Sequence, residues 1–240
     1  MLPADTRVLA DPAALAAEAC RLIEAAAQTA IGERKVFRLL LAGGSTPGLA
    51  YRLLGATQQN WPAWEIFWGD ERCLPVDDPA RNDRMARELW LARAAIPERN
   101  IHPIAAEIGA EQAAADYAGL IAGKQPFDLA ILGMGEDGHT ASLFPGRQND
   151  AAPVVAVSDA PKPPAGRVSL GFSVLRACRA QLVLVSGAAK SQALAAWRRG
   201  DDLPIARAVR SDACLLVDES LRGAIGEAAA SRGPNRTFCS

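Results

Sequence analysis

The stretch FDLAILGMGEDGH, residues 127–139, passes directly from a short apolar segment into a polar loop that is punctuated by glycines. The same order recurs in VFRLLLAGG at 36–44, WEIFWGDER at 64–72 and QLVLVSGAAK at 181–190. Apolar runs of this length, continuous rather than alternating, are typical of parallel strands that are buried on both faces. We therefore expect several parallel strands, each of which ends in a loop.

Helical segments separate these strands. Residues 11–30 repeat Ala, Leu and Ile at helical spacing, with Asp11 suited to cap the helix and Pro12 to its first position. STPGLAYRLL at 45–54 predicts a second helix, capped by Thr46, and further helices are expected over 86–95 and 111–122. ACLLVD at 213–218 supplies another buried strand. The alternation predicts an α/β fold with a doubly wound, mostly parallel sheet and helices on both faces. A length of 240 residues suits one domain, 1–240, alone or with a small appended lobe.

The composition indicates a small-molecule partner. With a formal net charge of −1, the chain has no electrostatic feature that favours nucleic acid or anionic lipid. No apolar run approaches the roughly 20 residues of a membrane helix, and the N-terminus lacks the pattern of a secretory signal, so we expect a cytoplasmic protein. The five cysteines are scattered and form no CxxC pair, which favours reduced thiols over disulfides or a metal site.

The segment GGSTPG at 43–48 has the composition of a phosphate cradle. Gly43 and Gly44 allow close backbone approach, Ser45 and Thr46 offer hydroxyls, and the start of the following helix presents free N–H groups to an anion. A tight strand-to-helix turn with no ligand explains the same residues. The segment is not a nucleotide P-loop, because the GK[ST] ending is missing.

GDER at 69–72 places charged side chains directly after an apolar strand. We expect a polar loop in which Asp70 and Glu71 orient sugar hydroxyls or Arg72, while Arg72 meets a phosphate or a developing oxyanion. A solvated surface loop is the alternative explanation.

The loop GMGEDGHTASLFPG at 133–146 contains the strongest candidates for catalysis. The neutral imidazole of His139 can accept a proton from water near pH 7, and Asp137 is close enough in sequence to hold it in one tautomer. His102, in NIHPI, has no polar neighbours and is expected to be structural.

Three cations lie near other strand ends: Lys162 and Arg167 in KPPAGR, and Lys190 in SGAAK. Lys190 falls at the start of an expected helix, where a cation opposes the helix dipole. Its position is understandable if an anion binds there, although a surface lysine that covers apolar neighbours is an alternative.

Taken in order, LAGGSTPG, WGDER, FDLAILGMGEDGHTASLFPG, APKPPAGRVSL and SGAAKSQAL resemble the 6-phosphogluconolactonase family over nearly the whole chain. The resemblance implies the fold shared with glucosamine-6-phosphate deaminases. It also implies hydrolysis of 6-phospho-D-glucono-1,5-lactone to 6-phospho-D-gluconate in the oxidative pentose phosphate pathway, without a cofactor. By the same resemblance His139 is the catalytic base, and Ser45, Thr46, Arg167 and Lys190 contact the phosphate or the rest of the substrate.

Two alternatives to lactone hydrolysis are a deaminase of the same fold and a sugar-phosphate sensor. The related deaminases carry a loop similar to DGHIAFNEP, with Glu before the proline, whereas this chain has Phe144 before Pro145. They also tend to have Tyr after their Asp-Glu pair, at the position of Arg72. A non-catalytic sugar-phosphate sensor would need an output module, and no basic helix-turn-helix segment or separate domain is visible. The sequence therefore favours lactone hydrolysis.

Overall fold

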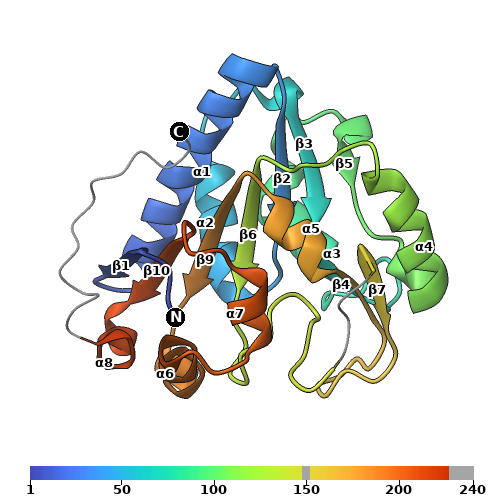
Figure 1. Cartoon of the computed structure of the whole chain (residues 1–240). Coiled ribbons are helices and arrows are strands. Elements are labelled where there is room, and N and C mark those ends of the chain that lie inside the picture. The colour runs from blue at the N-terminus through green and yellow to red at the C-terminus, as the bar shows by residue number, and fades with distance from the viewer. Residues whose placement is uncertain (148–151, 227–240) are drawn as a thin grey trace.

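The computed structural model describes residues 1–147 and 152–226, and its centre is a parallel β-sheet (Figure 1). Within these residues seven strands form the sheet, in the order β1-β10-β9-β6-β2-β3-β5, and every neighbouring pair is parallel. The expected parallel sheet is confirmed. The strands are β1 (Asp5–Leu9), β2 (Phe37–Leu41), β3 (Trp64–Trp68), β5 (Ile101–His102), β6 (Leu129–Gly133), β9 (Ala180–Val185) and β10 (Cys214–Asp218).

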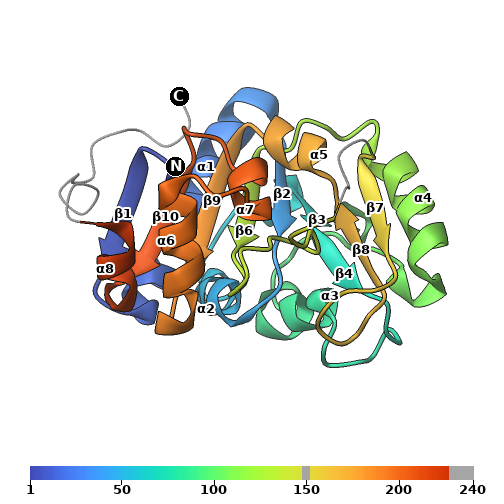
Figure 2. The same cartoon turned by 60° about the horizontal axis from the view of Figure 1, so that its bottom comes forward.

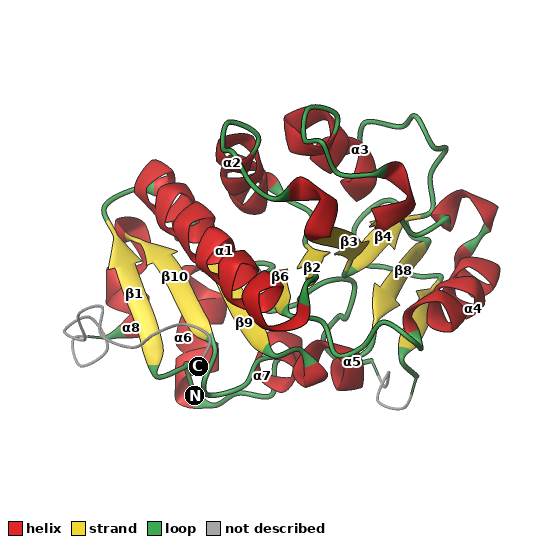
Figure 3. Ribbon diagram, turned by 90° about the horizontal axis from the view of Figure 1, so that it is seen from above, coloured by secondary structure: helices red, strands yellow, loops and turns green. Residues whose placement is uncertain are grey.

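Helices cover both faces of this sheet, as expected for a doubly wound fold (Figure 3). One face carries α1 (Pro12–Arg34), α2 (Ser45–Leu54) and α3 (Asn82–Ala86). The opposite face carries α5 (Phe172–Ala177), α6 (Ser191–Arg199) and α7 (Pro204–Ala208), and α8 (Arg222–Ile225) packs against α6. Strands β2, β3, β6, β9 and β10 are almost completely buried between these layers, which explains their apolar sequences, whereas the edge strand β1 is mostly half-buried.

A small antiparallel sheet forms the appended lobe (Figure 2). It consists of β4 (Asp70–Arg72), β7 (Val154–Val157) and β8 (Arg167–Leu170), in the order β4-β8-β7, and α4 (Ala110–Ile121) packs against it. The expectation of a polar loop at GDER is therefore wrong. The segment is strand β4, because β8 pairs with it from almost a hundred residues further along the chain.

The ends of the expected helices agree only in part with the structure. Asp11 caps α1, accepting a hydrogen bond from the backbone N–H of Ala14 at 2.7 Å. Thr46 does not cap α2, since the helix already begins at Ser45 and its cap position is Gly44, with φ +105° and no side-chain bond. The helix expected over 86–95 is instead α3 followed by a π-helical turn, Arg87–Leu91.

The topology places the carboxyl ends of β2 and β6 at a switch point. Strand β2 leads through α2 to β3 on one side, whereas β6 leads to β9 and β10 on the other. Ligands of open α/β sheets bind where the direction of winding reverses in this way. No helix in the described part of the chain combines the length and apolar character needed to cross a bilayer.

Candidate active site

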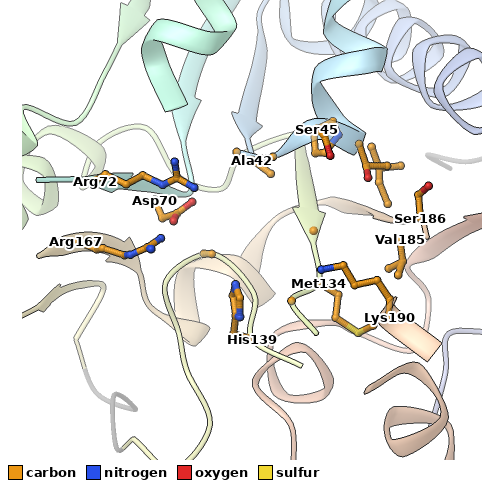
Figure 4. Close-up of a pocket in the computed structure, with 18 residues that line it drawn as sticks. Ala42, Ser45, Asp70, Arg72, Met134, His139, Arg167, Val185, Ser186 and Lys190 are labelled. Carbon is orange, nitrogen blue, oxygen red and sulfur yellow. The ribbon is translucent and has the colours of Figure 1, made fainter. Parts of the chain in front are cut away.

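A cavity of about 240 Å3 opens at this switch point, between the main sheet and the small sheet (Figure 4). Its walls are the loops after β2, β6 and β9, together with side chains from β4 and β8. The structure thus brings together segments that are far apart in the sequence. The predicted site residues that line the cavity are Gly43, Gly44, Ser45, Thr46, Asp70, Arg72, His139, Arg167 and Lys190.

His139 and Asp137 form a hydrogen-bonded pair at the cavity. Nδ1 of His139 lies 2.5 Å from Oδ1 of Asp137, and the same oxygen accepts the backbone N–H of His139 at 3.2 Å. Burial favours the protonated carboxyl, but the charge and the hydrogen bonds of His139 outweigh it and lower the pKa of Asp137. An ionised Asp137 holds the proton of neutral His139 on Nδ1. The lone pair of Nε2 is then available to accept a proton.

The glycines around His139 determine where the imidazole sits. A Cβ on Gly135 would collide with Nδ1 and Cε1 of the ring, so a larger residue would displace the pair from the loop. Gly138 adopts φ +83°, a conformation that side chains rarely take. The Oγ1 of Thr140 donates to the carbonyl of Gly133 at 2.8 Å and ties the loop back to β6. The first two of these observations explain why the loop needs Gly135 and Gly138.

The loop after β2 presents the start of α2 to the cavity. With Gly44 at the cap position and no capping side chain, the first N–H groups of α2 have no partner within the helix. The Oη of Tyr51 binds both the N–H and the carbonyl of Ala42 at 2.9 Å and fixes the loop from behind. This geometry favours an anion, as the cradle hypothesis requires.

Two arginines face each other across the small sheet. Arg72 on β4 pairs in register with Arg167 on β8, and both line the cavity beside Asp70 (Figure 4). Burial, and then the charge of Arg72, lower the pKa of Arg167. Within the described residues neither arginine has a carboxylate oxygen at ion-pair distance. Two neighbouring guanidinium groups without a salt bridge form a strong site for an anion.

Lys190 lies on the other side of the cavity, so that His139 stands between it and the arginines (Figure 4). Its Nζ is 3.9 Å from Glu136, and the Nζ of Lys162 is 3.6 Å from the same carboxylate. Lys162 is more than half exposed and does not line the cavity, in contrast to its expected role in binding. Arg167 and Lys190, both expected to contact the substrate, line the same cavity on opposite sides of His139 (Figure 4).

Glu71 is the other predicted contact that the structure places outside the cavity lining. It is fully buried, and its carboxylate accepts the backbone N–H groups of Arg72, Asn82 and Asp83 at 2.7 to 2.8 Å. Burial raises the pKa of Glu71 to about 7. Its role is to join β4 to the start of α3, because β4 turns successive side chains to opposite faces and Asp70 and Arg72 take the cavity side.

Sequence reasoning did not identify three polar residues at or behind the cavity. Ser186 lines it, and its hydroxyl binds Asp218. Asn82 and Ser142 are buried and contact Asp70 from two different segments. Ser186 and Ser142 lie in loops that the sequence had singled out, but their charged neighbours drew attention there, and Asn82 lies outside those loops. In the described residues no cluster of three His, Cys, Asp or Glu side chains is arranged to hold a metal ion.

Several known proteins resemble this chain over most of its length. A family model described as glucosamine-6-phosphate isomerases/6-phosphogluconolactonase matches residues 10–217. The 6-phosphogluconolactonase of Synechocystis is 40% identical, covering 69% of this chain and 72% of that protein. The 6-phosphogluconolactonase of Mycobacterium leprae is 33% identical, and the match covers 91% of this chain and 97% of that protein. The crystal structure of the 6-phosphogluconolactonase of Thermotoga maritima is similar with a TM-score of 0.82 at 29% identity, covering 89% and 98%.

Proposed function

Since the chain belongs to the family of glucosamine-6-phosphate isomerases and 6-phosphogluconolactonases, we propose that it is the enzyme that hydrolyses 6-phospho-D-glucono-1,5-lactone to 6-phospho-D-gluconate. The observation that carries the proposal is His139, held at Nδ1 by Asp137 in a cavity with cations on both sides. Such a site can activate water beside an anionic substrate. The reaction is a step of the oxidative pentose phosphate pathway.

In the mechanism, Nε2 of His139 takes a proton from water as the oxygen attacks the lactone carbonyl. A tetrahedral intermediate forms, and its oxyanion requires a preorganised positive charge. Arg72 and Arg167 provide that charge from the small sheet. The ring C–O bond then breaks, and the imidazolium returns its proton to the departing ring oxygen. Asp137 stabilises the imidazolium between these two steps.

We assign the phosphate to the opposite side of the cavity, at the start of α2 with Ser45, Thr46 and Lys190. The free N–H groups of the helix and the ammonium of Lys190 both favour a group that carries nearly two negative charges. We assign Arg167, one of the expected phosphate or substrate contacts, to the carbonyl end of the substrate, because it lies beside Arg72 (Figure 4). The substrate would then span the cavity past His139.

The same arrangement disfavours deamination. Phe144 is buried, and its ring lies 4.9 Å from that of His139 and 5.8 Å from the guanidinium carbon of Arg167. Phe144 places an apolar ring at the sequence position where the related deaminases carry their Glu. The wall beside His139 therefore has no second acid for ring opening at this position.

We propose further that the chain acts as one lactonase domain, with no metal or other cofactor and with no nucleic-acid or membrane partner. The cavity draws residues from both sheets, which supports a single functional unit. We place the enzyme in the cytoplasm, in keeping with its four described cysteines, which are all free thiols.

One experiment tests the function. Given freshly generated 6-phosphogluconolactone, the protein should release acid much faster than an enzyme-free control, and it should release no ammonia from glucosamine 6-phosphate. His139→Ala should lower kcat by about 100-fold or more while the protein stays folded. Ammonia release would favour the deaminase instead. Binding of 6-phosphogluconate with no turnover of either compound would favour a sensor.

A further inference from the structure

We propose that Ser142 and Asn82 are positioning residues, which hold the carboxylate of Asp70 as the acceptor for a hydroxyl group of the bound sugar. The inference rests on the proposed function, because it concerns how the same cavity selects a polyhydroxylated lactone. Among the described residues that line the cavity, Asp70 is the single acid. The orientation of its carboxylate therefore decides which hydroxyl groups of a bound sugar can donate a hydrogen bond to it.

Ser142 holds one oxygen of this carboxylate. Its Oγ donates to Oδ2 of Asp70 at 2.6 Å, a short charge-assisted bond, and Ser142 is completely buried. The backbone N–H of Ser142 donates to Oγ of Ser169 at 3.1 Å, and Ser169 pairs in register with Asp70 across the small sheet. The catalytic loop and the small sheet are thus joined by one buried chain of hydrogen bonds.

Asn82 holds the other oxygen from the start of α3. Its Nδ2 donates to Oδ1 of Asp70 at 3.2 Å and to the carbonyl of Asp70 at 2.8 Å. The same side chain packs so closely on the backbone of Gly43 that a Cβ there would collide with its Oδ1. Asn82 therefore sets the position of Asp70 relative to the loop that we assign to the phosphate.

Because Ser142 and Asn82 both donate to Asp70, its carboxylate can only accept further hydrogen bonds. A side-chain amide N–H cannot accept, and the hydroxyl of Ser142 donates to Oδ2, so both partners act as donors to Asp70. Each carboxylate oxygen keeps a free lone-pair direction, and the side chain reaches the cavity between Arg72 and Arg167 (Figure 4). A sugar hydroxyl can donate there. The two residues act on the substrate through Asp70 and do not line the cavity themselves.

A double-mutant cycle tests this inference. Ser142→Ala should lower kcat/KM for 6-phosphogluconolactone by about 10-fold or more, since one hydrogen bond to a charged group is lost. In an Asp70→Ala background the same substitution should have an effect below about twofold, because no carboxylate remains to be positioned. Asn82→Ala, combined with Asp70→Ala, provides a second and independent cycle if Ser142→Ala does not fold.

The control is Ser169→Ala, which removes a buried hydroxyl of the same chain without touching the bond between Ser142 and Asp70. It should leave kcat/KM closer to the parent value than Ser142→Ala does. Losses that are equal with and without Asp70 would show a purely structural role and would overturn the inference. The same cycle on the Kd for 6-phosphogluconate, measured by calorimetry, keeps the inference testable if the parent protein proves not to hydrolyse the lactone.

Discussion

Replacing Asp137 by Asn tests the catalytic pair most directly, because the change keeps the size of the side chain and removes its charge. In the parent protein Oδ1 of Asp137 binds both Nδ1 and the backbone N–H of His139. An asparagine oxygen in that position can keep both bonds but cannot stabilise the imidazolium that forms during attack. If the amide NH2 takes the position instead, the proton moves to Nε2 and His139 can no longer accept one from water.

The expected loss follows from the geometry. The contact of 2.5 Å is a charge-assisted bond, but the side chains are 20% and 38% exposed, so water screens part of the interaction. A hydrogen bond to a charged group typically corresponds to about 10- to 100-fold in an equilibrium or rate. We expect kcat to fall by that factor while KM changes little, because Asp137 does not line the cavity. A wrong tautomer would increase the loss further.

The assay is continuous acid release from freshly generated 6-phosphogluconolactone, corrected for spontaneous hydrolysis, with thermal unfolding as a check on folding. Glu136→Gln is the matched control, since it neutralises the preceding carboxylate of the same loop. Its contacts of 3.6 and 3.9 Å to Lys162 and Lys190 are long, and the side chain of Glu136 is 54% exposed, so kcat should stay within about twofold. A folded Asp137→Asn variant with the kcat of the parent would refute the assignment of this pair.

Four further outcomes are expected. Gly135→Ala should lower kcat by about 10-fold or more, because the added Cβ collides with the imidazole of His139, whereas Gly32→Ala, where a Cβ meets nothing, should leave it unchanged. Lys190→Ala should raise KM for the phosphorylated lactone by about 10-fold or more and have little effect on the unphosphorylated lactone. Arg167→Ala should slow the hydrolysis of both lactones. The opposite pattern would exchange the assignments of Lys190 and Arg167. Exhaustive chelation should leave the rate unchanged, and a loss restored by zinc or magnesium would contradict this. Because the pKa of Asp137 is lower in the folded protein, its charge stabilises the fold above about pH 4, and this stabilisation is lost as the pH falls through the folded pKa. The difference in Tm between the parent and Asp137→Asn should therefore shrink on acidification.

Local patterns in the sequence were sufficient for five strands of the main sheet and for locating the loop that carries His139. Continuous apolar runs predicted β2, β3, β6, β9 and β10, because strands that are buried on both faces need such residues wherever they lie in the sheet. The pairing of Asp137 with His139 was also within reach, since only Gly138 separates them in the sequence. The short strand β5 lacked such a signal, because two residues are too few for a pattern.

The tertiary structure alone decided which charged groups face one another. The hydrogen bond between Ser142 and Asp70 joins residues 72 positions apart, and Arg72 meets Arg167 only because β4 pairs with β8. Glu71 seemed equivalent to Asp70 in the sequence, yet the alternation of strand β4 turns it into the core. A sequence specifies the chemistry of each side chain and the periodicity of its neighbours. Which side chains share a cavity depends on the pairing of strands that lie far apart in the sequence, such as β4 and β8.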